Sequence, residues 1–294
     1  MADKWKKIKT GKVREVWQSS DNKRVALVAS DGVSAFDEQL GVIVPNKGRI
    51  LTQMSAKWFE LTGEKIPNAF LTADVNGMSR CFRNEHFDGR TTEMLALKMV
   101  PVEAIVRGYI TGSMWAKYCN GKRRICDYVM PEDLQESQEL PVPIYTPTTK
   151  APEGEHDKDI NFEQSVFAIE KAGFANSRRI AEQVRDYSLQ LYIICRDYAL
   201  QRGIILADTK FEFGVDEKGI LRVADELCTP DSSRFWSADN YKVGRNQPSM
   251  DKQIIRDWVK QAKENGDEHQ RVPGDILRET SEKYEECYRL LFAN

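Results

Sequence analysis

The 294-residue sequence predicts an α+β protein, and three features carry that prediction. Short runs typical of strands fill much of the first hundred residues, a long amphipathic helix is expected at residues 177–203, and a strand with alternating charges follows it directly. With 41% apolar residues the chain can bury a sizeable core, in one large domain or in two lobes. We therefore expect antiparallel hairpins first and a mixed α/β part after them.

The first third is predicted to form antiparallel hairpins around one helix. Strand-like runs lie at residues 10–17, 23–30, 40–45 and 92–100. Within residues 49–63 apolar side chains recur at helical spacing, and Gly63 provides a stop signal. This helix is expected to cover one face of the sheet.

The remainder is predicted to contain a long loop, three helices and a hairpin. Residues 135–159 hold four prolines with little periodicity, which predicts an irregular segment of functional importance. The helix at 177–203 carries an apolar stripe and ends at Gly203. Two more amphipathic helices are expected after Ser249.

The stretch "ADTKFEFG", residues 207–214, alternates charged and uncharged side chains. With the two-residue period of a strand, Asp208, Lys210 and Glu212 share one face, while a threonine and two phenylalanines occupy the other. A solvated ladder of salt bridges would give the same pattern. The apolar helix before the strand and the charged "TPDSSRFW" after it favour a buried site instead, since buried charges need partners or ligands.

The turn "DEKG" after this strand predicts a hairpin. If the turn pairs Val215 with Ile220, Lys210 lies opposite Asp225, and Glu212 becomes a diagonal neighbour of Asp225. Two carboxylates that are diagonal neighbours across a hairpin could share one cation. Mg²⁺ is commonly held by one or two carboxylates plus phosphates. The hairpin therefore predicts a magnesium site.

Residues 98–113, "KMVPVEAIVRGYITGS", suggest a nucleotide and phosphate region. Lys98 falls on a strand, and Glu103 falls in a short connector where an adenine edge could be read. Arg107 and Ser113 could hold a phosphate, because a guanidinium and a hydroxyl match its oxygens. A strand, a turn and a surface arginine would also explain the pattern.

The N-terminal "KIKTGKVREVW" places Gly11 at a turn among Lys9, Lys12 and Arg14. A glycine turn lets backbone N–H groups approach phosphates closely, although a solvated basic hairpin is the alternative. Neither G-x-G-x-x-G nor G-x-x-x-x-G-K-[ST] occurs, which speaks against a dinucleotide fold or a Walker loop.

Composition excludes several function classes. With 43 basic and 45 acidic residues there is no overall field for nucleic acid or an anionic membrane. No apolar run approaches the ~20 residues of a membrane span, and the N-terminus lacks a signal peptide, so we expect a cytoplasmic protein. Six cysteines without a Cys-x-x-Cys pair indicate reduced thiols. Because only three histidines occur, proton transfer should fall to carboxylates or lysines.

Six motifs together resemble the SAICAR synthetase family (phosphoribosylaminoimidazole-succinocarboxamide synthases). They occur in the expected order between residues ~10 and ~240 and read "GKVREVW", "SAFD", "VPVEAIVRGYITGS", "PTTKAPEGEHD", "ILADTKFEFG" and "DELCTPDSSRFW". One departure is Gly32, where many members carry an arginine before "SAFD". The departure affects the anion contact expected of that loop.

The resemblance implies a two-lobed fold similar to kinases and ATP-grasp enzymes, with an N-terminal lobe over residues 1–103 and a C-terminal lobe over 104–294. It implies a ligase of purine synthesis that joins carboxyaminoimidazole ribonucleotide (CAIR) to L-aspartate. ATP and Mg²⁺ are required, and SAICAR, ADP and phosphate are formed through an acyl phosphate. We expect only these small-molecule partners, no nucleic acid or membrane, and a monomer or small homo-oligomer.

Residue roles follow from the matching positions. The magnesium ligands would be Glu212 and Asp225, and the reacting groups would lie near Asp208 and Lys210. The nucleotide contacts would be Gly11, Lys12, Arg14, Lys98, Met99 and Glu103. The substrate contacts would be Ser34, Asp37, Arg107, Ser113, Asp231 and Arg234.

Two other functions are compatible with the same motifs. A kinase-like small-molecule phosphotransferase would stop at phosphoryl transfer, although an H-R-D catalytic loop and a D-F-G triplet, the marks of protein kinases, are missing. A non-catalytic nucleotide-binding module would bind ATP without turnover.

Overall fold

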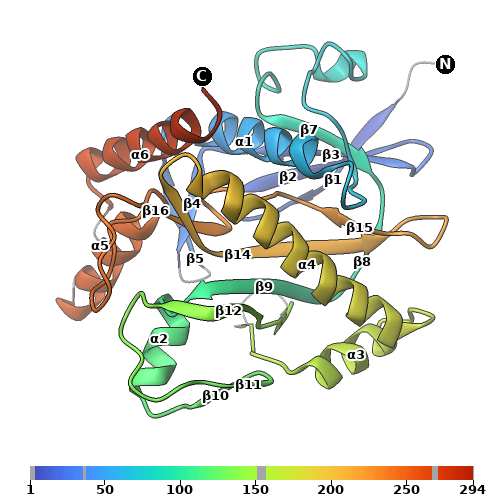
Figure 1. Cartoon of the computed structure of the whole chain (residues 1–294). Coiled ribbons are helices and arrows are strands. Elements are labelled where there is room, and N and C mark those ends of the chain that lie inside the picture. Colours follow the sequence, from blue (N-terminus) through green and yellow to red (C-terminus); the bar gives the residue numbers. More distant parts are fainter. Residues whose placement is uncertain (1–3, 36–37, 151–156, 267–270, 294) are drawn as a thin grey trace.

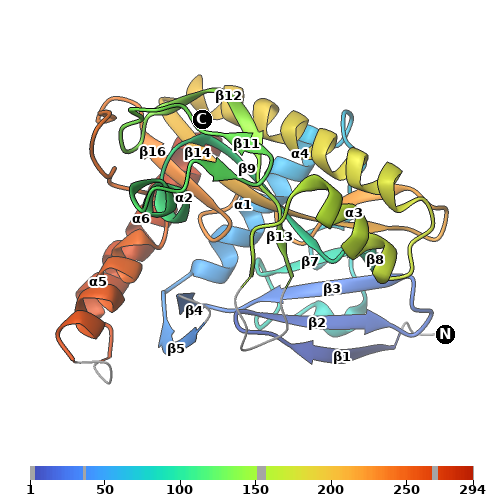
Figure 2. The same cartoon turned by 90° about the horizontal axis from the view of Figure 1, so that it is seen from below.

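The structure is a computed structural model that describes residues 4–35, 38–150, 157–266 and 271–293. Asp37 and the residues 151–156 of the "PTTKAPEGEHD" motif lie outside the described residues. The chain is organised around two antiparallel sheets, which Figures 1 and 2 show in two perpendicular views. The prediction of an α+β fold is confirmed.

The first sheet contains most of the predicted N-terminal hairpins. Its strands, in spatial order, are β1 (Trp5–Thr10), β2 (Arg14–Ser19), β3 (Arg24–Ala29), β7 (Thr91–Leu95) and β6 (Phe70–Thr72). The run at 40–45 does not join this sheet. It contributes to β5 (Glu38–Ile43), which forms a separate ribbon with β4 (Gly32–Ala35).

The second sheet is built around β14 (Ile204–Val215). Its main path is β12 (Glu139–Tyr145), β9 (Val102–Tyr109), β14 and β15 (Leu221–Ala224). Three short strands pair at its margins, namely β8 (Lys98–Met99), β13 (Thr148–Thr149) and β16 (Ser233–Ser237). The predicted strand at 92–100 is therefore divided, because β7 belongs to the first sheet whereas β8 pairs with β14.

The segment at 135–159 is less irregular than predicted, because it contains β12 and β13. Pro141 and Pro143 lie in β12, which is an edge strand and pairs with β9 on one side. The register of that pairing shifts between Glu139 and Ile144, so the prolines fall where the ladder is irregular. Proline is tolerated at such positions because no ladder hydrogen bond is lost there.

Helices cover the sheets and confirm the predicted amphipathic segments. Helix α4 (Ser177–Leu200) packs on β14 and β9, and α1 (Lys47–Thr62) lies beside α6 (Gly274–Phe292) in Figure 1. The other helices are α2 (Gly112–Cys119), α3 (Phe162–Lys171) and α5 (Gln253–Glu264). The largest core cluster joins α1 and α4 to β9 and β14. None of the helices in the described residues is long and apolar enough to cross a bilayer.

The hairpin formed by β14 and β15 differs by one residue from the predicted register. Val215 pairs with Leu221, and Glu212 lies opposite Ala224. The Asp216 side chain accepts the backbone N–H groups of Lys218 and Ile220, both at 2.9 Å, so Ile220 is taken into the turn. The predicted pairing of Lys210 with Asp225 is therefore wrong, because a slip of one residue changes every cross-strand pair.

Candidate active site

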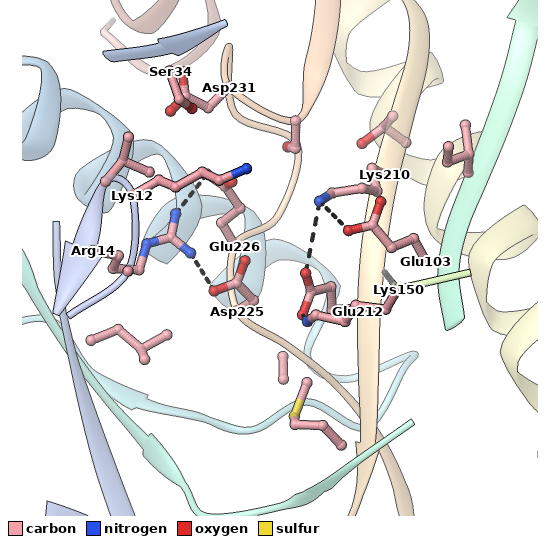
Figure 3. A pocket seen from close by; sticks show the side chains of 18 of the residues that line it. Lys12, Arg14, Ser34, Glu103, Lys150, Lys210, Glu212, Asp225, Glu226 and Asp231 are labelled. Atoms are coloured by element: carbon pink, nitrogen blue, oxygen red, sulfur yellow. Dashed lines mark hydrogen bonds and ion pairs between the residues drawn. The ribbon is translucent and has the colours of Figure 1, made fainter. Parts of the chain in front are cut away.

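A cavity of about 780 Å³ opens between the two sheets, and Figure 3 shows some of its side chains. Its lining contains nearly all of the predicted site residues that the structure describes. These are Gly11, Lys12, Arg14, Ser34, Met99, Glu103, Arg107, Ser113, Asp208, Lys210, Glu212, Asp225, Asp231 and Arg234. The structure therefore brings together positions that are more than two hundred residues apart in the sequence.

The floor of the cavity is formed by matching faces of β9 and β14. Asp208 pairs in register with Arg107, and Lys210 pairs with Ile105. The opposite face of β14 is buried, with Phe211 and Phe213 fully inaccessible. This confirms that the alternating charges of "ADTKFEFG" share one face, and places that face on the cavity.

Lys210 lies at the centre of the floor between two carboxylates. Its Nζ donates to Glu103 Oε1 at 2.8 Å and lies 3.7 Å from Glu212 Oε1. Burial alone would lower the pKa of Lys210, but Glu103 and Glu212 outweigh it and raise that pKa above its ordinary value. For Glu103 burial dominates and raises the pKa, although Lys210 opposes the shift. Lys210 is therefore a permanent cation at neutral pH.

Three carboxylates face the floor from two elements. Glu212 projects from β14 and also pairs with Lys150, whereas Asp225 and Glu226 follow β15. Arg14 bridges that second pair, hydrogen-bonding to Asp225 and lying 3.1 Å from Glu226 Oε2. Burial acts to raise the pKa of Asp225, but Arg14 prevails and lowers it, so this group stays ionised.

The carboxylate oxygens of this region suit a magnesium ion. Asp225 has a left-handed backbone, φ 63°, which takes its side chain out of the strand alternation and toward the cavity. Within the described residues no three His, Cys, Asp or Glu side chains form a complete metal cage. A hard cation held by Glu212 and Asp225 would thus need further oxygens from a substrate, which is the usual arrangement for Mg²⁺ beside phosphates.

A second part of the cavity is arranged for an anion. Asp208 Oδ2 accepts from Arg107 at 3.2 Å and from Arg234 at 2.6 Å, so one carboxylate orients two guanidinium groups. Arg107 also donates to Thr146 Oγ1 at 3.0 Å. Burial lowers the pKa of Arg107, whereas Asp208 raises the pKa of Arg234. The two guanidinium groups of Arg107 and Arg234 share one carboxylate, so this group of three side chains carries a net positive charge.

The first turn of α2 adds backbone donors to the same corner. The N-cap Thr111 makes no side-chain capping hydrogen bond, and Ser113 lines the cavity at the second position of the helix. Gly112 has φ +56°, and a Cβ on it would lie 2.5 Å from a nitrogen of Arg234. The glycine therefore lets the guanidinium lie directly against the start of the helix, where free N–H groups attract anions.

One side of the cavity is apolar. The side chains that form it come from β2, β3, β7 and the connector into β8, and they are Val16, Val25, Leu27, Met94, Leu95, Leu97 and Met99. The predicted connector is shorter than expected, because Glu103 already lies within β9. An apolar slot beside a basic glycine turn is suited to a flat base and its phosphates.

Lys98 is the one described residue of the predicted set that does not line the cavity. Its Nζ donates to the carbonyl of Gly173 at 2.6 Å and lies 4.0 Å from the ring centre of Phe174. Successive residues of a strand point to opposite sides, so Met99 faces the cavity and Lys98 faces away. The structure therefore does not bring Lys98 to the other predicted residues.

Six charged lining residues were not assigned a role from the sequence, namely Lys9, Lys150, Asp157, Glu226, Lys252 and Arg256. Glu226 adjoins the predicted Asp225, and Lys150 lies within a quoted motif. Lys252 and Arg256 come from the start of α5, and their four-residue spacing on a helix was the only available signal. Among the described lining residues there is no histidine and no cysteine.

Comparisons with known proteins give one consistent result. The sequence profile of the SAICAR synthetase family matches residues 7–273. The phosphoribosylaminoimidazole-succinocarboxamide synthase of Lachnospira eligens is 47% identical over 96% of this chain and 93% of its own. The enzyme of that name from Neisseria meningitidis serogroup B is 45% identical over 97% and 96%.

Solved structures agree with the sequence relatives. The SAICAR synthase of Saccharomyces cerevisiae, solved in complex with SAICAR, superposes with a TM-score of 0.83 at 36% identity, covering 98% of this chain and 95% of its own. A SAICAR synthetase in complex with ADP superposes with a TM-score of 0.70 at 25% identity, covering 97% of both chains. The chain therefore belongs to the SAICAR synthetase family, the ATP-dependent ligases of purine biosynthesis.

Proposed function

We propose that this enzyme joins the carboxylate of CAIR to the amine of L-aspartate, with one ATP consumed for each amide formed. One observation carries the proposal: a single cavity contains an apolar slot, a carboxylate pair and a doubly basic anion corner. These three parts match a nucleotide base, a magnesium-bound phosphate chain and a second phosphorylated substrate. The sheets on either side would act as the two lobes, divided near residue 103.

The nucleotide is assigned to the first sheet. The base would enter the apolar slot near Met99, and the phosphates would lie along the Gly11 turn beside Lys12. Glu212 and Asp225 would hold Mg²⁺. When bound, the ion neutralises charge on the phosphoryl group that is transferred. The ADP complex of the related enzyme supports nucleotide binding by this fold.

The ribonucleotide phosphate is assigned to the anion corner. Arg107 and Arg234 offer planar guanidinium groups, and Ser113 with the start of α2 offers a hydroxyl and N–H donors. Asp208 holds both arginines and thereby fixes the distance between their charges. In this assignment the imidazole carboxylate would point toward Lys210 and the carboxylates Glu212 and Asp225.

Aspartate is assigned to the wall formed by α5. It carries two carboxylates, and Lys252 and Arg256 are cationic lining residues that the other two substrates do not use in this arrangement. Ser34 of β4 lines the same cavity and can donate a hydrogen bond.

The chemistry follows from the charges. An amine cannot displace oxygen from an ionised carboxylate, because the carbon is electron-rich and oxide is a poor leaving group. ATP would phosphorylate a carboxylate oxygen, and the amine would then attack the acyl phosphate, form the C–N bond, release phosphate and lose a proton. The Lys210 ammonium would stabilise both the transferring phosphoryl group and the later oxyanion.

The path of one oxygen atom tests this mechanism. If the CAIR carboxylate is labelled with heavy oxygen, the released phosphate should contain one labelled oxygen for each amide formed, as measured by mass spectrometry. Unlabelled phosphate together with labelled amide would show that the carboxylate never accepted the phosphoryl group. Omitting aspartate is the control, because a simple phosphotransferase would still convert ATP to ADP at full rate.

A further inference from the structure

Asp231 is a buried carboxylate that three side chains share. Lys47 Nζ lies 2.6 Å from Oδ2, and these two side chains are only 1% and 6% exposed. The hydroxyl of Tyr284 donates to Oδ1 at 3.1 Å, and Lys252 Nζ lies 3.7 Å from the same oxygen. Both oxygens of Asp231 are thus engaged by side chains of the protein.

Two lysines contact Asp231 at different distances. Lys47 neutralises the carboxylate at close range, and it does not line the cavity. Lys252 stands farther away and does line the cavity. Burial lowers the pKa of Lys252, while Asp231 acts to keep the ammonium charged. Lys252 is therefore the lysine of this cluster that faces the cavity.

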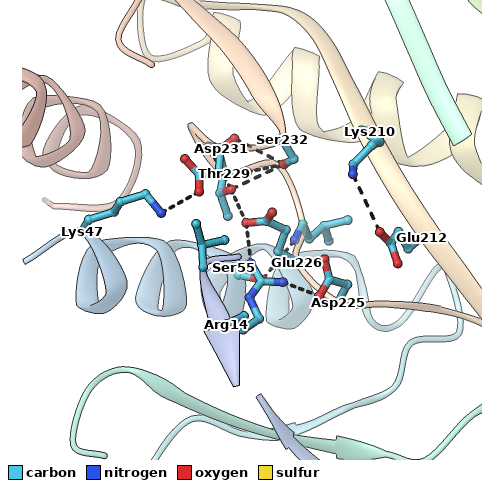
Figure 4. A network of polar contacts seen from close by, with 12 residues as sticks. Arg14, Lys47, Ser55, Lys210, Glu212, Asp225, Glu226, Thr229, Asp231 and Ser232 are labelled. Carbon is cyan, nitrogen blue, oxygen red and sulfur yellow. Dashed lines mark hydrogen bonds and ion pairs between the residues drawn. The ribbon is translucent and has the colours of Figure 1, made fainter. Parts of the chain in front are cut away.

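Four separate elements meet at this carboxylate. Lys47 begins α1, Lys252 is the N-cap of α5, Tyr284 lies within α6, and Asp231 lies in the loop between β15 and β16. Figure 4 shows Lys47 reaching Asp231 beside the loop that carries Glu226 and Asp225. The same loop is tied to α1 where the N–H of Leu227 donates to Ser55 Oγ at 3.0 Å.

We propose that Tyr284 and Asp231 are positioning residues that hold the Lys252 ammonium at the cavity wall, and that this is how the C-terminal helix α6 takes part in the reaction. The hydroxyl of Tyr284 fixes the Oδ1 side of the carboxylate, while Lys47 occupies the other side. The Lys252 ammonium then interacts with a carboxylate whose orientation is fixed, rather than with one that is free to rotate. This inference rests on the proposed function, because it assigns Lys252 to the carboxylates of aspartate.

Tyr284→Phe is the direct test, because it removes one hydroxyl and keeps the buried ring. We expect the KM for aspartate to rise about five- to tenfold, the net effect of losing one hydrogen bond, while the KM values for ATP and CAIR change less than about twofold. Tyr288→Phe is the matched control: it removes the same group from a half-buried tyrosine one turn later on α6 and should leave all three constants unchanged.

A second background separates positioning from a general structural effect. The Lys252→Met enzyme should itself show a raised KM for aspartate. Tyr284→Phe in that background should cause no further rise, because the effects of two residues that act through one group are not additive. An additional rise in that background, or equal rises for all three substrates, would overturn the proposal. A rise confined to CAIR would overturn it as well. The proposed function is tested separately, by whether the wild-type enzyme forms SAICAR. If it does, that function stands even where the variants show that Tyr284 has no positioning role.

Discussion

The cavity floor and the loop of residues 225–232 carry similar charges but are held in place by different means. On the floor, β9 and β14 place Arg107, Asp208 and Lys210 by regular pairing, so a pleated sheet sets their spacing. In the loop, Asp225 and Cys228 have left-handed backbones, φ 63° and 44°, and distant helices hold the chain. We therefore expect a floor substitution that leaves no buried cation unpaired to change chemistry alone, whereas a substitution in the loop should change chemistry and folding together.

The largest effect is expected for Asp231→Asn, which tests the loop side of this comparison. The substitution leaves the buried Lys47 ammonium without its counterion, and breaking a buried pair in this way costs about 3–5 kcal/mol of unfolding free energy. Urea unfolding at pH 7 measures it. Asp257→Asn, on the exposed face of α5, should cost less than about 0.5 kcal/mol.

The difference in unfolding free energy between the wild type and Asp231→Asn should depend on pH in a defined direction. Burial acts to raise the pKa of Asp231, but Lys252 and Lys47 hold it well below the ordinary value. Its contribution to stability is therefore complete above the unfolded-state pKa of about 4 and is lost as the pH falls further. The stability difference between wild type and Asp231→Asn should narrow below about pH 4. A difference that stays constant down to pH 3 would contradict this account of the loop.

A smaller effect is expected for Glu212→Gln, which tests the floor side. Loss of one metal carboxylate should lower kcat on the order of a hundredfold at limiting Mg²⁺, while the unfolding free energy changes by less than about 1 kcal/mol. Glu217→Gln, at the exposed turn of the same hairpin, is the control and should keep full activity. If Glu212→Gln destabilised the enzyme as much as Asp231→Asn, floor and loop could not be distinguished in this way.

The smallest effect is expected for Gly112→Ala, a substitution that adds a single Cβ beside the cavity floor. Gly112 and Gly121 both have positive φ, +56° and +83°, so alanine strains both backbones by about 1–2 kcal/mol. Only at Gly112 would the new methyl group meet Arg234; at Gly121 nothing lies within 4 Å. Gly112→Ala should therefore raise the KM for CAIR about threefold or more beyond any change in Gly121→Ala. If both variants had the same KM for CAIR, Arg234 would not contact the phosphate of CAIR in the anion corner.

The floor could be predicted because its signal is local. Asp208, Lys210 and Glu212 repeat with the period of a strand, and that period fixes a shared face whatever the partner strand is. Arg107 was found through its motif, and Glu103 has the same alternation on β9 although it was expected in a connector. The outward direction of Lys98 depends on which sheet β8 joins, which its own residues do not determine.

The loop could not be built from the sequence, because its geometry depends on long-range contacts. The one-residue error in the hairpin arose from the Asp216 side chain, whose hydrogen bonds enlarge the turn. Asp225 nevertheless reaches the cavity, through a left-handed backbone that alternation cannot describe. Lys47, Tyr284 and Lys252 come from three helices, and nothing in any one helix indicates that they converge on Asp231.

The absence of histidine and cysteine from the described cavity lining has a consequence for how the enzyme responds to its surroundings. The Lys210 ammonium and the Asp225 carboxylate are both held in their charged forms by their neighbours. The described lining therefore offers no imidazole or thiol, the side chains that most often exchange protons near neutral pH. The proton that the aspartate amine loses as the amide forms would then pass to a phosphate oxygen or to water, while Lys210 and Asp225 keep their charges.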